Sequence, residues 1–380
     1  MFKILIWESL SILAGGQKVA LQIASALGGK YECVFFIPND GPLALELEKR
    51  NIKYHILNIG QYSVGEKKVS DILKYFLKTP KIFVHAYKLI RQEKIQLIYV
   101  NAARNFMWSA LLGKLMSIPV MWHVHNYFQD NKTKFLIRSM GRFKSVKKIV
   151  FVANSVKKQF PALEAKSTVV FNGIETDKFL LINSKVSQIR SEFKIPDFKR
   201  IVISIGWLMP TKRQDILLKA VPLILSQIRD VHFIFVGGKR EGYESYYNEL
   251  LDMVHDMGIE DHVTFTGHRV DVPEILKDSC INIITSEEAF PFTLLEGWAS
   301  GVPTIGPDYG SIPELIEDNK TGLIYDHTSP NDLSEKIIDL LKDKQKYEKI
   351  KGCALGNSKK YDIAQFNKNI CSLIDEVLIS

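Results

Sequence analysis

Glu288 lies where a predicted strand leads into a helix, and a second glutamate, Glu296, lies about two helical turns further on. The apolar run 280–285 predicts a buried parallel strand. Residues 292–300 have helical spacing and are followed by Gly301, which is typical of a helix end. The N-terminus of such a helix has unpaired N–H groups and a partial positive charge, so it suits a phosphate. Two acids at this spacing could also form a general acid/base pair, as in glycoside hydrolysis.

Two histidines lie at the end of the predicted strand 120–125, where open α/β sheets bind their ligands. His123 and His125 point to the same face because side chains alternate along a strand. No third ligand for zinc is near them in the sequence. We therefore expect His125 to form hydrogen bonds in an active site, with an ordinary interior histidine as the alternative.

The elements that must position these residues alternate between strand and helix. In the first half, the predicted strand 3–7 leads through Gly15 and Gly16 into a helix that ends near Leu27. This order is typical of a nucleotide-binding sheet, but the G-x-G-x-x-G fingerprint is missing, which argues against a dinucleotide. Further strands are predicted at 31–37, 53–57, 97–100, 120–125 and 148–152 and from residue 167, with helices at 43–50, 67–94, 106–117 and 154–160.

The second half repeats this alternation. Its predicted strands are 200–206, 232–237, 263–266, 281–285, 302–305 and 322–325, and its helices are 215–225, 243–257, 272–277, 292–300 and 362–377. Such alternation predicts parallel sheets covered on both faces, hence two doubly wound, Rossmann-like domains that face one cleft. The polar stretch 182–198 marks the boundary. We expect domains at 1–182 and 183–361, and the helix 362–377 must pack against one of them.

Composition sets limits on the class of protein. The chain has 380 residues, 46% of them apolar and 24% charged, which suits a globular protein of two domains. Its four cysteines show no metal-binding spacing, so we expect unpaired core residues in a reducing compartment. Glu8 interrupts the apolar N-terminus and no cleavage site follows, which argues against a signal peptide. No apolar run is long enough to span a membrane.

Charge is distributed unevenly along the chain. Residues 1–190 contain 29 Lys+Arg and 12 Asp+Glu, a net charge of +17, and the remainder has 21 and 30, a net charge of −9. The basic half could face an anionic membrane or a phosphorylated acceptor; nucleic acid is disfavoured because no binding motif is present. The helical region 67–94, where Pro80 should cause a break or a kink, is either a membrane-surface helix or a cover helix with a solvated basic face.

Several motifs in order along the chain together resemble the family-4 glycosyltransferases, whose two-domain fold is called GT-B. A single E-x7-E pattern is weak, but several motifs in register over almost the whole chain are specific. The residues that carry the resemblance are Gly15-Gly16, His125, Asn172-Gly173-Ile174 with Phe179, Gly206 with Lys212, Gly267 with Asp271, Glu288 with Glu296, and Gly310-Ser311-Ile312-Pro313-Glu314.

The resemblance implies a retaining transfer of a sugar from a nucleoside-diphosphate donor, with UDP or GDP expected and no obligatory metal or other cofactor. It implies that Glu288 faces the donor sugar, Glu296 the ribose, and His125 the transferred sugar. Lys212 would hold the diphosphate, helped by the backbone of Gly16, Phe292 and Thr293. Gly206 would belong to the same donor site, and Gly267, His268 and Arg269 would lie beside the base. In this family the C-terminal helix crosses back onto the N-terminal domain, so the resemblance implies that 362–380 packs on 1–182.

The chain departs from the family pattern at three positions. Trp207 replaces an arginine that would bind the diphosphate, and indole cannot supply that charge; Arg213 is long enough to compensate. Pro291 replaces a glycine and has no N–H, and Asn126 replaces an aspartate.

The function expected from these residues is a glycosyltransferase that acts on a lipid-linked or polysaccharide acceptor. The enzyme would be cytoplasmic and peripheral, binding the anionic inner membrane face through its basic N-terminal domain, without nucleic acid as a partner. Trp207 motivates the alternative, a non-catalytic GT-B partner subunit that stabilises an active glycosyltransferase.

Overall fold

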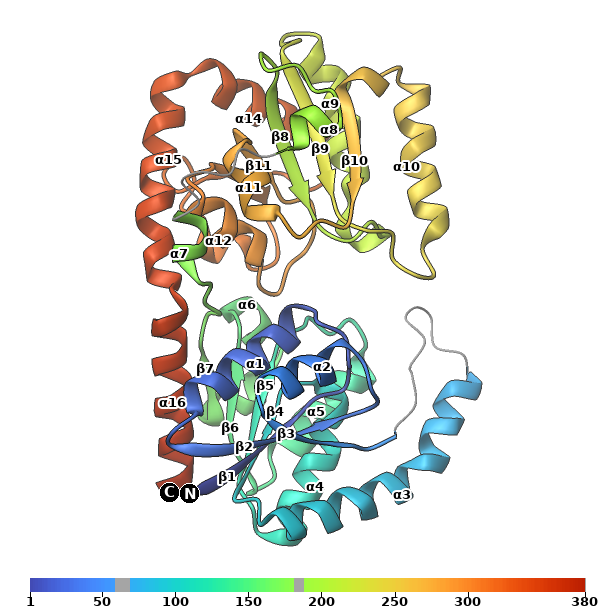
Figure 1. Ribbon diagram of the computed structural model, residues 1–380, viewed down its shortest axis with the longest axis vertical. Helices are drawn as coiled ribbons and strands as arrows, with labels where there is room; N and C mark the ends of the chain where they lie inside the picture. Colours follow the sequence, from blue (N-terminus) through green and yellow to red (C-terminus); the bar gives the residue numbers. More distant parts are fainter. Residues whose placement is uncertain (59–68, 181–187, 380) are drawn as a thin grey trace. The chain divides into compact units, whose positions relative to one another are not determined.

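The computed structural model describes residues 1–58, 69–180 and 188–379, without the side chains of 69–79 (Figure 1). The chain forms two compact units. Unit 1 comprises Met1–Asn172 and Ala364–Ser380, and unit 2 comprises Gly173–Ile363. None of the described helices combines the length and apolar character that crossing a membrane requires.

Unit 1 contains a parallel sheet of seven strands in the order β3-β2-β1-β4-β5-β6-β7. The central strands are buried on both faces, which explains why they are continuously apolar instead of alternating. The strands are β1 (Phe2–Trp7), β2 (Tyr31–Ile37), β3 (Lys53–Ile56), β4 (Leu97–Val100), β5 (Val120–Val124), β6 (Val146–Phe151) and β7 (Ser167–Val169). The helices are α1 (Gly15–Leu27), α2 (Pro42–Lys49), α3 (Val69–Glu93), α4 (Phe106–Met116), α5 (Asn131–Gly141), α6 (Asn154–Lys157) and α16 (Ile363–Ile379).

Unit 2 repeats the arrangement with six parallel strands in the order β10-β9-β8-β11-β12-β13. The strands are β8 (Arg200–Ile205), β9 (Val231–Val236), β10 (Val263–Gly267), β11 (Ile281–Ile283), β12 (Thr304–Pro307) and β13 (Leu323–Tyr325). The helices are α7 (Thr176–Leu180), α8 (Ile189–Glu192), α9 (Gln214–Leu225), α10 (Glu244–Asp256), α11 (Val272–Lys277), α12 (Phe292–Ala299), α13 (Ile312–Leu315), α14 (Pro330–Lys342) and α15 (Lys344–Ser358). In both sheets the strand order reverses beside the first strand, so the predicted pair of doubly wound sheets is confirmed.

The C-terminal helix α16 packs on unit 1, as the resemblance implied. Its Asp375 accepts hydrogen bonds from Lys30 (2.6 Å) and Tyr31, and its Glu376 pairs with Lys148 at 3.0 Å. The boundary between the units lies earlier than residue 182. The reason is that Ile174 pairs with the chain at the start of α16. The Ile174 N–H donates to the Tyr361 carbonyl at 3.0 Å, and the Ile363 N–H donates to the Ile174 carbonyl at 2.9 Å.

Several predicted elements differ from the structure, and three of the differences have a clear physical reason. The helix predicted at 154–160 ends at Lys157, because Pro161 starts a separate 3₁₀ helix, Pro161–Lys166. Pro80 was expected to cause a break or a kink in the helix. The break does not occur, because α3 continues through Pro80, which is exposed. The strand predicted at 302–305 is Thr304–Pro307, because Val302 completes the turn after α12 with a hydrogen bond to the Gly297 carbonyl (2.8 Å).

The carboxyl ends of β8, β9 and β10 are held together by close backbone contacts at Gly237. The Gly206 N–H donates to the Val236 carbonyl at 2.9 Å, and the Gly237 N–H donates to the Gly267 carbonyl at 3.0 Å. A Cβ atom at position 237 would lie 1.8 Å from the Gly206 oxygen. Only glycine fits there, so Gly237 fixes the relative positions of two loops predicted to bind the donor.

Replacing Gly237 with alanine is expected to destabilise the protein by on the order of 3 kcal/mol or more, because the added methyl group overlaps the Gly206 carbonyl. Urea unfolding measures this. The matched control is Gly356→Ala in α15, where a Cβ has open space and alanine should stabilise the helix by about 0.5–1 kcal/mol. Equal stability of the two variants would contradict this account of the contact.

Candidate functional site

Lys212 and Glu288 form an ion pair at the carboxyl edge of the unit 2 sheet. The Lys212 Nζ contacts the Glu288 Oε1, and the Ser286 hydroxyl donates to the same oxygen at 2.6 Å. The pair forms because β8 and β11 are neighbours in the sheet, so the loops that follow them meet. The Thr285 hydroxyl also donates to the Lys212 carbonyl at 2.5 Å. Both charged side chains are about a quarter exposed, 27% and 22%, so a ligand can reach them.

The segment Gly310-Ser311 holds the backbone at Glu288. The Ser311 N–H and hydroxyl both donate to the Glu288 carbonyl, at 3.0 and 2.8 Å. Gly310 has φ +70°, and a Cβ there would lie 3.1 Å from the same carbonyl oxygen. The Gly-Ser-x-Pro-Glu motif therefore positions the carboxylate of another motif.

The helix α12 presents an N-terminus without a side-chain cap. Its N-cap residue is Pro291, which forms no side-chain hydrogen bond, so the first N–H groups of the helix, at Phe292 and Thr293, suit an external acceptor. The helix lies close against the sheet because a Cβ on Gly297 would be 2.9 Å from both Asn282 and Thr304. Glu296, half-buried, belongs to the same helix. Glu288, Lys212 and this helix terminus together form the donor-site candidate of unit 2.

Trp207 lies in an aromatic and cationic group after β8. Its indole is 40% exposed and lies 6.4 Å from the His268 ring, centroid to centroid. The Arg240 guanidinium lies 5.2 Å from the indole centre, a favourable cation–π distance. Arg240 belongs to none of the family motifs. It follows another strand, β9, so its contact with Trp207 depends on the order of the strands in the sheet. Arg213, proposed to replace the missing arginine, lies 3.4 Å from the Asp215 carboxylate instead.

Arg269 is held by two carboxylates. It donates to Asp271 through Nε (2.9 Å) and Nη2 (2.8 Å), and through Nη1 to both oxygens of Glu192 at 2.8 Å. The hydrogen bonds with Asp271, more than those with Glu192, raise the pKa of Arg269. Gly267 has φ +71°, which places the turn before this cluster. In this structure the guanidinium therefore ties α8 to the loop after β10.

In unit 1, Asn101 joins the two predicted site residues. Its Nδ2 donates to the Gly16 carbonyl at 2.8 Å, and its Oδ1 lies 2.7 Å from the His125 Nε2. Asn101 directly follows β4, between the strands β1 and β5 whose connections carry Gly16 and His125. The sequence signal for Asn101 is weak: it is a polar residue at a strand end and belongs to none of the family motifs.

Glu8 is fully buried beside this group. It accepts hydrogen bonds from the Asn101 Nδ2 (2.6 Å) and the Gln17 Nε2 (2.9 Å), and its backbone carbonyl accepts one from Asn105 (3.0 Å). Burial raises the pKa of the Glu8 carboxyl to about 7, although the hydrogen bonds from Gln17, Asn101 and the Ser9 N–H lower it. The sequence signal for Glu8 is an acid that directly follows an apolar stretch.

Both histidines, His123 within β5 and His125 directly after it, are neutral near pH 7. Burial lowers the pKa of His125 to about 3, and burial and His125 hold the pKa of His123 well below its usual range. The two rings lie 3.9 Å apart, and the His123 Nδ1 lies 2.7 Å from the Tyr99 hydroxyl. Within the described ranges, one exposed cluster has metal-ligating side chains, Asp308, Asp326 and His327, and it includes none of the predicted site residues.

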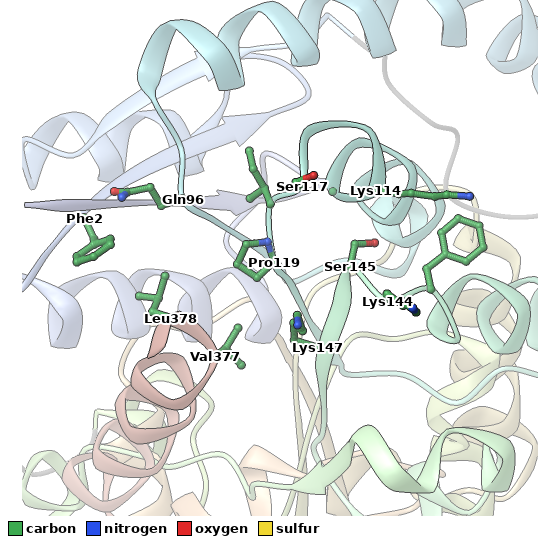
Figure 2. A pocket seen from close by; sticks show the side chains of 13 residues that line it. Phe2, Gln96, Lys114, Ser117, Pro119, Lys144, Ser145, Lys147, Val377 and Leu378 are labelled. Carbon is green, nitrogen blue, oxygen red and sulfur yellow. The ribbon is translucent and has the colours of Figure 1, made fainter. Parts of the chain in front are cut away.

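A groove of about 790 Å³ lies at the opposite edge of the unit 1 sheet (Figure 2). Most of its lining residues lie at or just before the amino ends of β1, β4, β5 and β6, and the others belong to α4 and α16. Lys114, Lys144 and Lys147 line it together with apolar side chains that include Pro119 and Leu378. None of the predicted site residues lines this groove.

Two known families match the chain. Residues 13–178 match the family described as Glycosyltransferase Family 4, and residues 185–354 match Glycosyl transferases group 1. Together they cover most of both units.

Individual relatives match three quarters or more of the chain. N-acetyl-alpha-D-glucosaminyl L-malate synthase of Bacillus anthracis is 25% identical, over 88% of this chain and 86% of its own. The GDP-mannose-dependent alpha-(1-6)-phosphatidylinositol monomannoside mannosyltransferase of Mycobacterium tuberculosis is also 25% identical, over 75% and 76%. The structure of Anabaena HepE in complex with UDP and glucose superimposes with a TM-score of 0.83 at 20% identity, covering 99% of this chain and 100% of that chain.

The buried Glu8 should make stability depend on pH. Because its folded pKa is raised from 4.5 to about 7, its contribution is full below pH 4.5 and is lost as pH rises through 7. Between about pH 5 and about pH 8.5, the free energy of unfolding of the wild type should fall relative to Glu8→Gln by on the order of 3 kcal/mol.

Denaturant unfolding at several pH values measures this difference. The neutral histidines His123 and His125 have the opposite effect, because the stability that they contribute is lost as pH falls below their ordinary pKa of 6.5. Both proteins contain these histidines, so their contribution cancels in the difference between wild type and Glu8→Gln. A difference that stays constant with pH would contradict the raised pKa.

Proposed function

The chain belongs to the family-4 glycosyltransferases and has the GT-B fold, and on this premise we propose that it is a retaining enzyme that uses a nucleoside-diphosphate sugar. The proposed acceptor is a lipid-linked or polysaccharide molecule at the cytoplasmic membrane face. The observation that carries the proposal is the accessible pair of Lys212 and Glu288 after neighbouring strands, close in sequence to the uncapped α12.

The proposed chemistry is stabilisation of a leaving diphosphate. The Lys212 ammonium and the N–H groups of Phe292 and Thr293 would bind the phosphate oxygens, and positive charge placed there lowers the barrier to departure. Glu288 would accept hydrogen bonds from the donor sugar, and Glu296 from the ribose. The acceptor hydroxyl would attack from the face that the diphosphate leaves, passing its proton to a phosphate oxygen.

The remaining predicted residues keep proposed roles in donor binding. Gly206 lies against the Lys212 stem, since a Cβ there would be 3.8 Å from the Lys212 Cδ. His268 pairs with Trp207 and is proposed to lie beside the base, whereas Arg269 would act there through the loop that it ties down. Gly16 and His125 of unit 1 are proposed to contact the diphosphate and the transferred sugar. No metal ion or other cofactor is part of the proposal.

Relatives support UDP or GDP as the nucleotide. HepE was solved with UDP and glucose, and the mycobacterial relative is named as GDP-mannose-dependent. The name of the latter also includes a phosphatidylinositol acceptor, which supports a lipid-linked acceptor for this chain.

Glu288→Gln should reduce transfer by about 10²–10³-fold without unfolding the protein, because the amide replaces one acceptor oxygen with a donor toward Lys212 and the sugar.

Lys212→Met should weaken binding of UDP or GDP by about 10–100-fold, the effect of losing a charge-assisted hydrogen bond. Product formation by mass spectrometry and calorimetry measure the two effects. Lys219→Met, a half-exposed lysine of α9, is the matched control. Full activity of Glu288→Gln would refute the assignment.

A non-catalytic partner subunit is the second candidate. It is favoured by Trp207, since the indole with Arg240 and His268 offers a stacking surface where the family has a bidentate guanidinium. Calorimetry with UDP, GDP and ADP separates the candidates. Micromolar binding of one nucleotide supports the enzyme, and binding of none supports the partner subunit.

Membrane binding is proposed to involve α5 of unit 1. Phe135 and Leu136 of this helix are 68% and 40% exposed, and Lys132 is also exposed. The helix follows β5, so its N-terminus lies at the sheet edge of His125. The other candidate, the helix α3, buries Ala86, Leu89 and Ile90, and Phe83 forms a ring pair with Trp108, which favours a cover helix for residues 80–93. Lys67 and Lys68 lie outside the described residues.

The protein should bind vesicles that contain anionic phospholipid, and the binding should weaken as salt rises, because exposed charge pairs are screened. Phe135→Ser with Leu136→Ser should weaken binding about tenfold or more, since apolar area no longer enters the membrane. The control is Val270→Ser, an exposed apolar residue of unit 2. Vesicle sedimentation measures both, and absence of binding at low salt would remove the membrane from the proposal.

A further inference from the structure

Glu8 is a buried acid whose side-chain partners are neutral. The side-chain donors to its two carboxylate oxygens are the amides of Gln17 and Asn101, the Ser9 N–H also forms a hydrogen bond with the carboxyl, and the exposure of Glu8 is 0%. Burying a carboxylate with such partners costs free energy that an apolar side chain would not. We therefore looked for a function of Glu8 in the hydrogen bonds that it forms with neighbouring residues at the sheet edge.

The hydrogen bonds of Asn101 determine which way its amide faces. Its Nδ2 donates to two oxygens, the Glu8 Oε1 at 2.6 Å and the Gly16 carbonyl at 2.8 Å. Turning the amide over would place its oxygen against both acceptors. The Oδ1 is thereby committed to His125, whose Nε2 lies 2.7 Å away.

The orientation of Asn101 in turn determines the tautomer of His125. Because the Asn101 Oδ1 is an acceptor, the Nε2 that faces it must carry the proton. His125 is neutral near pH 7, so its Nδ1 keeps a lone pair and is a hydrogen-bond acceptor. A sugar hydroxyl can donate to Nδ1 in this tautomer and cannot in the other.

We propose that Glu8 is a positioning residue of the sugar-transfer site, which through Asn101 holds the Gly16 carbonyl and keeps His125 in the Nε2–H tautomer. The inference rests on the proposed function, because His125 matters only if it meets a sugar. Other titratable groups near this network are Tyr99 and His123, which bond to each other through the Tyr99 hydroxyl and the His123 Nδ1. Glu8 and Asn101 follow β1 and β4, neighbouring strands of the sheet, so the arrangement is part of the fold.

The test combines ¹⁵N NMR of histidine-labelled full-length protein at about pH 8 with steady-state kinetics. The His125 signals are identified by their loss in His125→Gln. In the wild type they should show a protonated Nε2 and an unprotonated Nδ1. Glu8→Met should give a mixture of tautomers and lower kcat about tenfold. KM for the nucleotide sugar should rise by a smaller factor, because the donor-binding groups of unit 2 are untouched and only Gly16 is affected.

Glu8→Gln is the conservative variant, because its amide oxygen can still accept from Asn101. It should restore the wild-type tautomer and most of kcat. If Glu8→Met does not fold, Asn101→Ala should lose the tautomer preference in the same way. A folded variant of either kind that keeps the Nε2–H tautomer and wild-type kcat would overturn the proposal.

The tautomer measurement needs no substrate, so it separates this inference from the proposed function. A shifted tautomer in a protein that transfers no sugar would support the positioning of His125 and refute the enzyme assignment. An unshifted tautomer in an active enzyme would refute the role of Glu8 alone.

Discussion

Parallel strands of one sheet end at the same edge, and both candidate sites depend on this constraint. In unit 2, β8 and β11 are neighbours, so Lys212 and Glu288 meet although 76 residues separate them. In unit 1, β1, β4 and β5 are neighbours, so the residues that follow them, Glu8, Asn101 and His125, form one hydrogen-bonded group. The buried apolar strands provide the stability, and the loops at their carboxyl ends are left to carry polar chemistry.

The two units hold carboxylates in different ways. Glu288 is partly exposed and paired with a cation, and such a pair contributes little to stability, so a ligand can compete for Lys212 at small cost. Glu8 is buried among amides, and its charge is expensive. The first arrangement suits a group that must exchange partners with a substrate, and the second suits a group that must never move.

Trp207 changes how the donor site of unit 2 can recognise a ligand. An arginine would form two parallel hydrogen bonds to a diphosphate, whereas the indole offers a flat face beside His268 and Arg240. The guanidinium beside the indole is that of Arg240, which follows β9, and not that of an arginine at position 207 after β8. Arg269 shows the converse, a motif cation whose charge is already neutralised by Glu192 and Asp271.

The sequence alone determined the alternation of strands and helices, the two doubly wound sheets, and the positions of Glu288, Glu296 and Lys212, because periodicity and short motifs are local properties. Only the tertiary structure decided which loops meet. Glu8 carries no motif and is joined to Asn101 across 93 positions, and Arg240 reaches Trp207 from another strand. Such contacts depend on strand order, which no single segment encodes. Burial adds a second tertiary effect. It raises the pKa of the Glu8 carboxyl from 4.5, the ordinary value for a glutamate in water, to about 7.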